Sequence, residues 1–203
     1  MRIYRSLILI AIFLVSCNSN NKKQNFDSKQ NSSVNNQMHE LIKILNKDSK
    51  QHQDIGSKLT DSEIKEIELQ IGLTLPNSYK LFLTQFGNGA NWLYMNPIDD
   101  IKRFSYLRKY RKELGKTVKL VGEKEIDVDS LLCLMTEDSN GGAWCWLTTE
   151  NTSSGEWPLA YFSMDDNKLH YKVESFTEWL RLLTKSKYEV IRELDTEDKL
   201  GLG

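Results

Sequence analysis

Hydrophobic residues recur at helical spacing in the first part of the chain and form short continuous runs in the second part. Apolar positions three or four residues apart predict amphipathic helices, at residues 38–45, 60–71, 76–86, 98–114 and 176–183. Apolar runs around polar turns predict two β-hairpins, with strands at residues 131–135, 143–147, 159–164 and 169–173. Helices followed by strands and a closing helix predict an α+β fold, with a mainly antiparallel sheet packed with several helices.

Capping and turn residues mark the ends of these helices. Thr60 and Glu63 form a Thr-x-x-Glu capping box, and Ser175–Glu178 repeats the pattern before the closing helix. Gly72 stands where a left-handed helix end is expected. Pro76 biases the preceding residue towards extended backbone and can itself start the next helix.

The N-terminus follows the pattern of a bacterial lipoprotein signal peptide. Two arginines precede an apolar run at residues 7–15, which is about half of the ~20 residues that a membrane-spanning helix needs. Residues 14–17 resemble a lipobox, in which the small Ser16 admits the peptidase and the Cys17 thiol receives the diacylglyceryl group. We therefore expect cleavage between Ser16 and Cys17, and a lipid membrane anchor on acylated Cys17. The alternative is an ordinary secretory signal that contains a cysteine.

The expected organisation is a signal peptide, a tether and one domain. Residues 18–37 are rich in Asn, Ser, Lys and Gln, so they cannot bury enough apolar surface to offset the entropy of ordering. We assign residues 1–16 to the signal peptide and 17–37 to the lipidated cysteine and a disordered tether. Residues 38–203 form the domain, which is expected in the cell envelope outside the cytoplasm.

The overall charge excludes one class of partner. Lys and Arg number 27 and Asp and Glu number 28, which gives a net charge of −1. A chain that is nearly neutral has no global field to attract a polyanion. We therefore expect no nucleic-acid partner.

A series of short motifs spans residues 59–183. It contains the Leu75–Pro76 link, a helix centred on Tyr79 with a Phe82–Leu83 step, and the Asn88–Gly89 turn. Later motifs are a glycine turn before a tryptophan strand, a Pro-Leu-Ala-Tyr strand and a Ser-Phe-x-x-Trp-Leu helix, at residues 140–144, 158–161 and 175–180. Together they resemble the SUKH superfamily (Smi/Knr-like domains), which includes fungal cell-wall-synthesis regulators and many bacterial immunity proteins. The resemblance implies a SUKH-like α+β domain with its core at residues 59–183.

The sequence contains no pattern typical of a catalytic, metal or cofactor site. His39, His52 and His170 form no metal-binding pair, and Gly141–Gly142 lacks the Lys and Ser/Thr of a phosphate-binding loop. Paired carboxylates such as Asp99–Asp100 can do acid–base work in glycosidases, but Asp also favours turns and helix starts. We expect a protein that is not an enzyme and has neither metal nor cofactor.

Loops rich in Asp, Asn and Trp are the predicted partner-binding surface. Acidic side chains could contact a basic toxin, and tryptophans are typical interface anchors. The alternative is that these residues form ordinary solvated turns. The predicted partner-binding residues are Glu137, Asp138, Asn140, Trp157, Asp165 and Asp166.

Cys133 and Cys145 form a possible disulfide. If the first hairpin is symmetric about Ser139, Cys133 faces Cys145, Leu134 faces Trp144 and Leu132 faces Trp146. Directly opposed strand residues can have Cβ atoms close enough to bridge, and disulfides persist in exported proteins. The alternative is a pair of small buried hydrophobic residues.

Two functions compete on this basis. The resemblance implies a protein-binding domain that neutralises a cognate toxin, here as a membrane-anchored immunity lipoprotein. The alternative is a non-enzymatic envelope or cell-wall-associated regulatory or structural lipoprotein, in which basic residues between Lys102 and Lys112 contact anionic lipid or polymer. An envelope hydrolase ranks last, because the sequence offers no catalytic constellation.

Overall fold

The computed structural model describes residues 33–48, 55–90, 97–122, 124–137, 141–150, 152, 154–186 and 189–199. The signal peptide, Ser16, Cys17 and most of the predicted tether lie outside the described residues. So do His52, Asp138 and Asn140. The roles assigned to these residues stay predictions.

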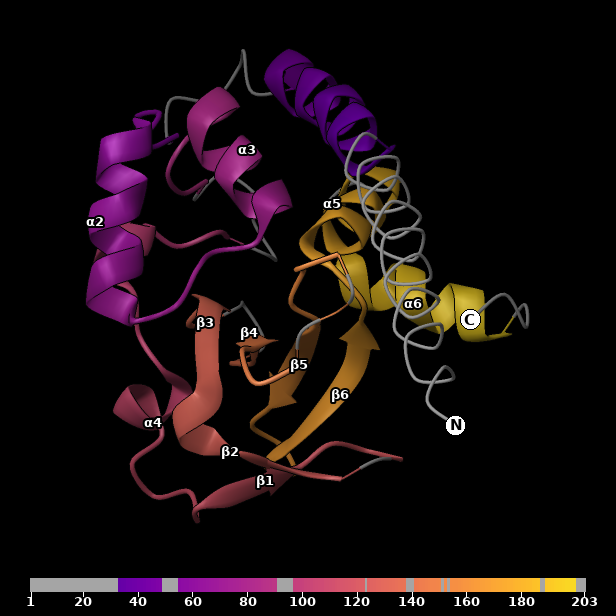
Figure 1. Cartoon of the computed structure of the whole chain (residues 1–203). Coiled ribbons are helices and arrows are strands. Elements are labelled where there is room, and N and C mark those ends of the chain that lie inside the picture. Colours follow the sequence, from indigo (N-terminus) through magenta and orange to yellow (C-terminus); the bar gives the residue numbers. More distant parts are fainter. Residues whose placement is uncertain are drawn as a thin grey trace, which may run out of the picture.

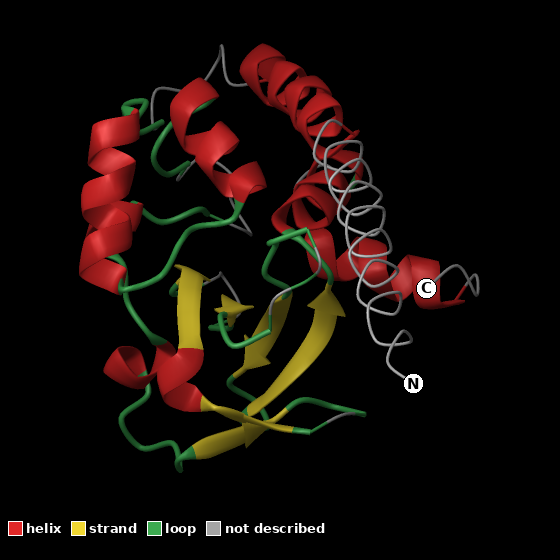
Figure 2. Cartoon of the chain, viewed as in Figure 1, coloured by secondary structure: helices red, strands yellow, loops and turns green. Residues whose placement is uncertain are grey.

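A four-stranded antiparallel sheet forms the centre of the fold (Figure 1 and Figure 2). Its strand order follows the chain: β3 (Leu131–Met135), β4 (Ala143–Leu147), β5 (Leu159–Ser163) and β6 (Lys168–Val173). Both predicted hairpins are present, and the α+β prediction is confirmed. A separate two-stranded sheet pairs β1 (Thr117–Lys119) with β2 (Glu125–Asp127).

Helices pack on one face of the central sheet. They are a helix at residues 33–48, α2 (Asp61–Ile71), α3 (Asn77–Gln85), α5 (Phe176–Lys185) and α6 (Val190–Lys199). Sheet residues such as Trp144 and Trp146 share one buried cluster with these helices. The helical assembly lies at one end of the molecule in Figure 1, and β1 and β2 lie at the other.

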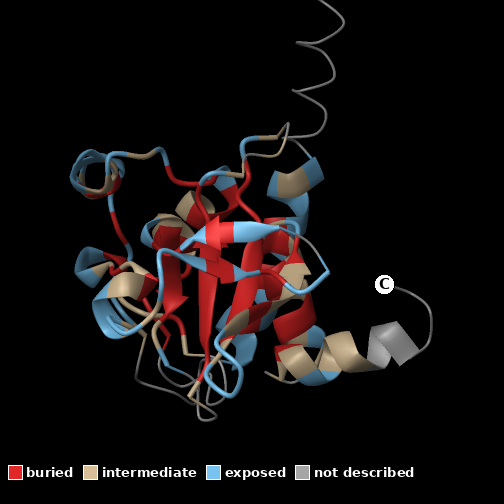
Figure 3. Cartoon of the chain, turned by 90° about the horizontal axis from the view of Figure 1, so that it is seen from below, coloured by how far each residue is buried: buried red, intermediate tan, exposed pale blue. Residues whose placement is uncertain are grey.

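The second face of the sheet has a core of its own. Cys133, Cys145 and Phe162 point into a cluster that also contains Leu107 of the short helix α4 (Leu107–Tyr110) and Val118 of β1. Because strand residues alternate between the two faces, a sheet covered on both sides must be apolar at every position. All five residues of β3 and all five of β4 are indeed buried, and buried segments gather at the centre of Figure 3.

Aromatic rings join the helices to the sheet. The Tyr79 ring on α3 meets the Trp146 ring on β4 edge to face, with centroids 4.6 Å apart, and the Phe176 ring on α5 at 5.0 Å. Phe82 packs on Phe176 at 5.4 Å. Such offset and edge-to-face contacts stabilise a core beyond simple area burial. Tyr79, the central residue of the predicted helix motif, therefore fixes α3 on the sheet.

Both outer strands of the central sheet have backbone partners. The Cys133 amide on β3 donates to the Ser105 carbonyl at 2.9 Å. On β6, the Leu169 carbonyl accepts from the Val121 amide at 2.9 Å. Other segments of the same chain thus cover each edge at these positions, which limits pairing of the sheet with other molecules there.

The prediction of one long helix at residues 98–114 is wrong. The chain forms only a 3₁₀ turn, η2 (Ile101–Arg103), and the single turn of α4. Between them Tyr106 is extended and bridges to Leu132 of β3. Backbone pairing with the sheet edge outweighs the local helical pattern, which is a tertiary effect that spacing alone does not report.

The domain begins earlier than predicted. The first helix runs over residues 33–48, so it starts five residues before the expected boundary at residue 38. Its inward positions Met38, Ile42 and Leu45 are buried as the spacing predicts, and Val34 packs against the same cluster. The last residues assigned to the tether therefore belong to the domain.

The register of the β3–β4 hairpin matches the prediction at two positions and departs at a third. Cys133 pairs with Cys145 and Leu132 with Trp146, but Met135 rather than Leu134 pairs with Trp144. A bulge between Cys133 and Met135 causes the shift. The Leu134 carbonyl accepts instead from the Asp99 amide at 3.0 Å, outside the hairpin.

The capping box of α2 is present and carries an additional ion pair. The Thr60 amide donates to the Glu63 carboxylate at 2.8 Å, and the Glu63 amide donates to the Thr60 hydroxyl at 3.3 Å. The Lys102 ammonium donates to the same carboxylate at 2.7 Å. The Lys102 bond, followed by the bonds from Thr60, lowers the pKa of Glu63 to about 2.

Helix α3 takes its N-terminal cap from a distant loop. Its own N-cap residue, Pro76, makes no side-chain cap bond. The Glu156 carboxylate accepts from the Ser78 amide at 3.1 Å and also from the Ser78 hydroxyl. Glu156 is only 3% exposed, and burial raises its pKa above the ordinary value. A buried acid thus satisfies free donors at the start of α3.

We expect Glu63→Gln to flatten the acid limb of the stability curve. The folded-state pKa of Glu63 is about 2, below its ordinary value of 4.5. The unfolded chain therefore binds the proton more readily, so this stabilisation is present above pH 4.5 and is lost as pH falls towards 2. Urea unfolding followed by tryptophan fluorescence across this range measures the slope. The exposed control Glu113→Gln should follow the wild-type curve; equal slopes for all three proteins would contradict the prediction.

We expect Glu156→Ala to lower the free energy of unfolding by about 1–3 kcal/mol, because two buried donors of Ser78 lose their acceptor. Glu156→Gln should cost less, since its amide oxygen still accepts from Ser78. The raised pKa of Glu156 means that the wild type loses stability as pH rises above 4.5, and the Gln variant lacks this decline. Urea unfolding at several pH values measures both effects. Equal stability of Glu156→Ala and wild type would refute the cap.

Candidate partner-binding site

The acidic turn of the β5–β6 hairpin is exposed, as predicted. Asp165 and Asp166 both lie on the surface. The Asp166 carboxylate contacts the His170 ring at 3.1 Å and the Lys168 ammonium at 3.2 Å. The His170 bond, followed by the Lys168 bond, lowers the pKa of Asp166. Asp166 is therefore engaged with side chains of its own hairpin.

The other predicted partner-binding residues divide into two groups. Glu137 is exposed at the end of β3, before the part of the turn that lies outside the described residues. Trp157 is only 3% exposed, and its ring packs edge to face on Trp146 at 6.2 Å. The expectation that Trp157 is a surface anchor is wrong. Its loop turns inward to cap α3 through the adjacent Glu156, and this carries the indole into the core.

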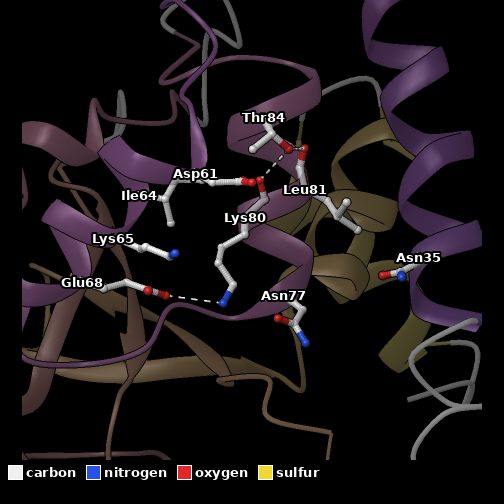
Figure 4. Close-up of a pocket in the computed structure, with 9 residues that line it drawn as sticks. All are labelled: Asn35, Asp61, Ile64, Lys65, Glu68, Asn77, Lys80, Leu81 and Thr84. Carbon is white, nitrogen blue, oxygen red and sulfur yellow. Dashed lines mark hydrogen bonds and ion pairs between the residues drawn. The ribbon is translucent and has the colours of Figure 1, made fainter.

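A groove of about 460 Å³ is lined mainly by α2 and α3, and its lining extends to Asn35 of the first helix (Figure 4). We call it the α2–α3 groove. Nine residues line it: Asn35, Asp61, Ile64, Lys65, Glu68, Asn77, Lys80, Leu81 and Thr84. The apolar side chains of Ile64 and Leu81 come from opposite walls, and polar groups surround them. Concave sites with a small number of placed polar groups are typical of binding sites.

An ion pair joins the two walls of the α2–α3 groove. The Glu68 carboxylate on α2 contacts the Lys80 ammonium on α3 at 3.4 Å, and both side chains are less than one-third exposed. The same carboxylate accepts from the Leu75 amide at 2.8 Å, in the link between the helices. Glu68 therefore fixes both the link and the distance between the walls.

Four other polar side chains of the α2–α3 groove have no partner among the described residues, whereas the Thr84 hydroxyl donates to the Lys80 carbonyl within α3. Within the described residues, no hydrogen bond or ion pair engages the side chains of Asp61, Lys65, Asn35 and Asn77. In Figure 4 Asp61 and Lys65 extend from α2 towards α3. The groove thus offers a carboxylate, an ammonium and two amides to a ligand. This set suits a polypeptide segment with polar side chains and free backbone groups.

A second hollow of about 700 Å³ lies beside the first helix, and its polar groups are more fully engaged. His39 contacts the Gln85 side chain at 2.9 Å, and Lys43 pairs with Glu40. A ligand there would have to displace these internal contacts. The α2–α3 groove is therefore the better candidate.

The α2–α3 groove was not predicted from the sequence, although a signal was present. Asp61, Lys65 and Glu68 recur at helical spacing along α2, and Asn77, Lys80 and Thr84 do so along α3. Residues spaced in this way share one face of a helix. Two facing polar stripes indicate a groove only once the helices are known to be neighbours, which the sequence pattern does not state.

Within the described ranges, no group of three or more His, Cys, Asp or Glu side chains could hold a metal ion. In that same part of the chain, none of the helices has the length and apolar character needed to cross a membrane. The lining of the α2–α3 groove contains neither His nor Cys.

Comparison with known proteins identifies the family. A search of curated proteins finds no match. The family model SUKH_6, described as SMI1-KNR4 cell-wall, matches residues 61–180. The match covers α2, α3, the central sheet and the first half of α5, which is more than half of the 203 residues. The resemblance to the SUKH superfamily is thereby confirmed, and the chain belongs to the SUKH_6 (SMI1-KNR4 cell-wall) family.

Proposed function

We propose that this chain is a membrane-anchored bacterial lipoprotein whose SUKH domain binds another protein, and that it acts as an immunity protein that neutralises a toxin. The α2–α3 groove supports the binding role, because both of its walls present polar side chains that have no partner within the described part of the chain. The family supports the biological role, since SUKH proteins of bacteria are often immunity proteins. Neutralisation then follows from direct binding, without chemistry on the toxin.

The polar lining of the α2–α3 groove supports recognition rather than catalysis. Lys65 and Asp61 are exposed side chains of opposite charge, which suits complementary contacts to a partner. Ile64 and Leu81 supply apolar surface to the lining. A partner loop that buries an apolar side chain there and pairs with the rim charges would gain both affinity and specificity.

The lipid anchor would place this binding site at the envelope. Ser16 and Cys17 end a short apolar segment in the manner of a lipobox. Dual acylation holds a protein stably at a membrane, whereas one chain gives marginal binding. A tethered domain outside the cytoplasm would meet a toxin as it arrives at the cell.

A cell-wall role is the second candidate, because the matched family carries a cell-wall description. In that case the protein would be a non-enzymatic regulatory or structural lipoprotein of the envelope. The gene neighbourhood separates the two roles. An adjacent toxin gene supports immunity, and an adjacent envelope-synthesis cluster supports the second role.

We expect Lys65→Glu to weaken binding to the protein encoded by the adjacent gene by at least about tenfold, which corresponds to ~1.4 kcal/mol. Lys65 is exposed and lines the groove, so the variant should fold normally. Lys119→Glu makes the same charge change on β1 and should bind as wild type. Co-expression, pull-down and titration calorimetry measure the effect.

The same assay includes Asp165→Asn as a probe of the predicted acidic turn. Loss of binding in Asp165→Asn, with normal binding in Lys65→Glu, would place the partner at the β5–β6 turn and contradict the groove. Absence of a complex with the wild type, together with no protection against the neighbouring gene product, would contradict the immunity role.

We expect Cys17→Ala to abolish palmitate labelling and to move the protein from the membrane fraction to the soluble fraction. The thiol of Cys17 is the proposed acceptor of the diacylglyceryl group, so its removal leaves no lipid attachment. Metabolic labelling with an alkyne fatty acid and ultracentrifugation measure the change. Cys133→Ala, which leaves the lipobox intact, is the matched control. A labelled Cys17→Ala protein would rule out the anchor.

A further inference from the structure

Cys133 and Cys145 lie directly opposite each other on β3 and β4, with their sulfur atoms 3.6 Å apart. Both are free thiols in the structure and both are buried. We propose that they form an intrachain disulfide when the chain folds in an oxidising compartment. The compartment is part of the proposed function, because it rests on export through the N-terminal signal.

The strand geometry suits a bridge at this pair. The Cys133 amide donates to the Ser105 carbonyl on the far side of β3, so it points away from β4. Cys133 and Cys145 therefore occupy a non-hydrogen-bonded pair, for which the Cα atoms of antiparallel strands lie ~4.5 Å apart and the side chains approach most closely. Disulfides span Cα distances of about 4.4–6.8 Å, so the backbone already has a permitted separation.

The surroundings favour a closed bridge once it has formed. Both cysteines belong to the buried cluster between the sheet and the β1–β2 pair, which also contains Phe162, Ala160 and Leu107. Cys145 is fully buried, and its bond with Cys133, followed by burial, raises its pKa. Thiolates, not thiols, attack disulfides, and burial of both cysteines keeps an external oxidant away from them, so they react slowly once the protein has folded. Oxidation therefore takes place during folding, before the core closes.

The chemistry needs an external disulfide as the oxidant. The thiolate of one cysteine attacks the disulfide of an envelope thiol–disulfide oxidoreductase, or of oxidised glutathione, and forms a mixed disulfide while one thiol leaves. The second cysteine then attacks the mixed bond and displaces the other thiol. Two S–H bonds are lost and one intrachain S–S bond forms, while the oxidant is reduced to two thiols.

A bridge here would close the turn that carries part of the predicted partner surface. The loop between the two cysteines contains Glu137, Asp138 and Asn140. Cross-linking the ends of a loop restricts the unfolded chain, which stabilises the folded hairpin. The bulge beside Cys133 would then be held between the disulfide and the turn.

An oxidative refolding experiment tests the geometry independently of export. The full-length chain is unfolded in guanidinium with reductant, transferred to detergent with reduced and oxidised glutathione, and alkylated after unfolding. We expect peptide mapping to find residues 133 and 145 linked, and the denaturation midpoint to fall when a reductant is added. Cys145→Ala should show no link and no response to reductant. Two alkylated thiols at these positions in the refolded wild type would overturn the proposal.

A cellular experiment separates failure of the disulfide from failure of export. Cells that express the full chain are acid-quenched, alkylated and fractionated, beside cells that express Ile10→Arg, which interrupts the apolar run of the signal. We expect a linked pair in the envelope fraction and free thiols in the retained variant. Free thiols in envelope-located wild type would refute the bridge. Wild type found in the cytoplasm would refute export, and refolding alone would then decide the geometry.

Discussion

Burial of the central sheet on both faces is the constraint on which the rest of the fold depends. A strand such as β4, with no exposed residue, requires a separate apolar cover on each side. The helices supply one cover through the Tyr79, Trp146 and Phe176 contacts. The β1–β2 pair and α4 supply the other. The segment between η2 and α4 is extended because it joins these two layers along the edge of β3.

The α2–α3 groove results from the way in which helices α2 and α3 are attached to the rest of the domain. The aromatic residues of helix α3 fix it on the central sheet, and Glu156 fixes its N-terminus. Helix α2 is fixed through Glu68, which bonds to the Leu75 amide and pairs with Lys80. Neither arrangement uses the outward polar residues of the two helices. Asp61, Lys65 and Asn77 can therefore vary with little effect on folding, which is the freedom that a partner-specific surface needs.

Local signals predicted those parts of the fold that local interactions determine. Thr60–Glu63 and Gly72 placed the ends of α2 correctly, because capping bonds form within one turn of the helix. The helical pattern at residues 98–114 gave a wrong prediction, because Tyr106 pairs with Leu132, which is distant in the sequence. Trp157 was misplaced for a similar reason: its loop is polar in sequence, but the contact with Trp146 is long-range. The sequence did not predict the groove, because its lining comes from more than one helix.

The covered edges of the central sheet restrict how a partner can dock. Many recognition domains accept an extended peptide as one more strand, so that affinity comes from backbone hydrogen bonds and sequence is read only secondarily. Here the Cys133 amide already donates to the Ser105 carbonyl, and the Leu169 carbonyl already accepts from the Val121 amide. Strand addition is blocked at these positions. Under the proposed binding function, side chains rather than backbone would then carry recognition, and a single substitution on either protein would be enough to change the choice of partner.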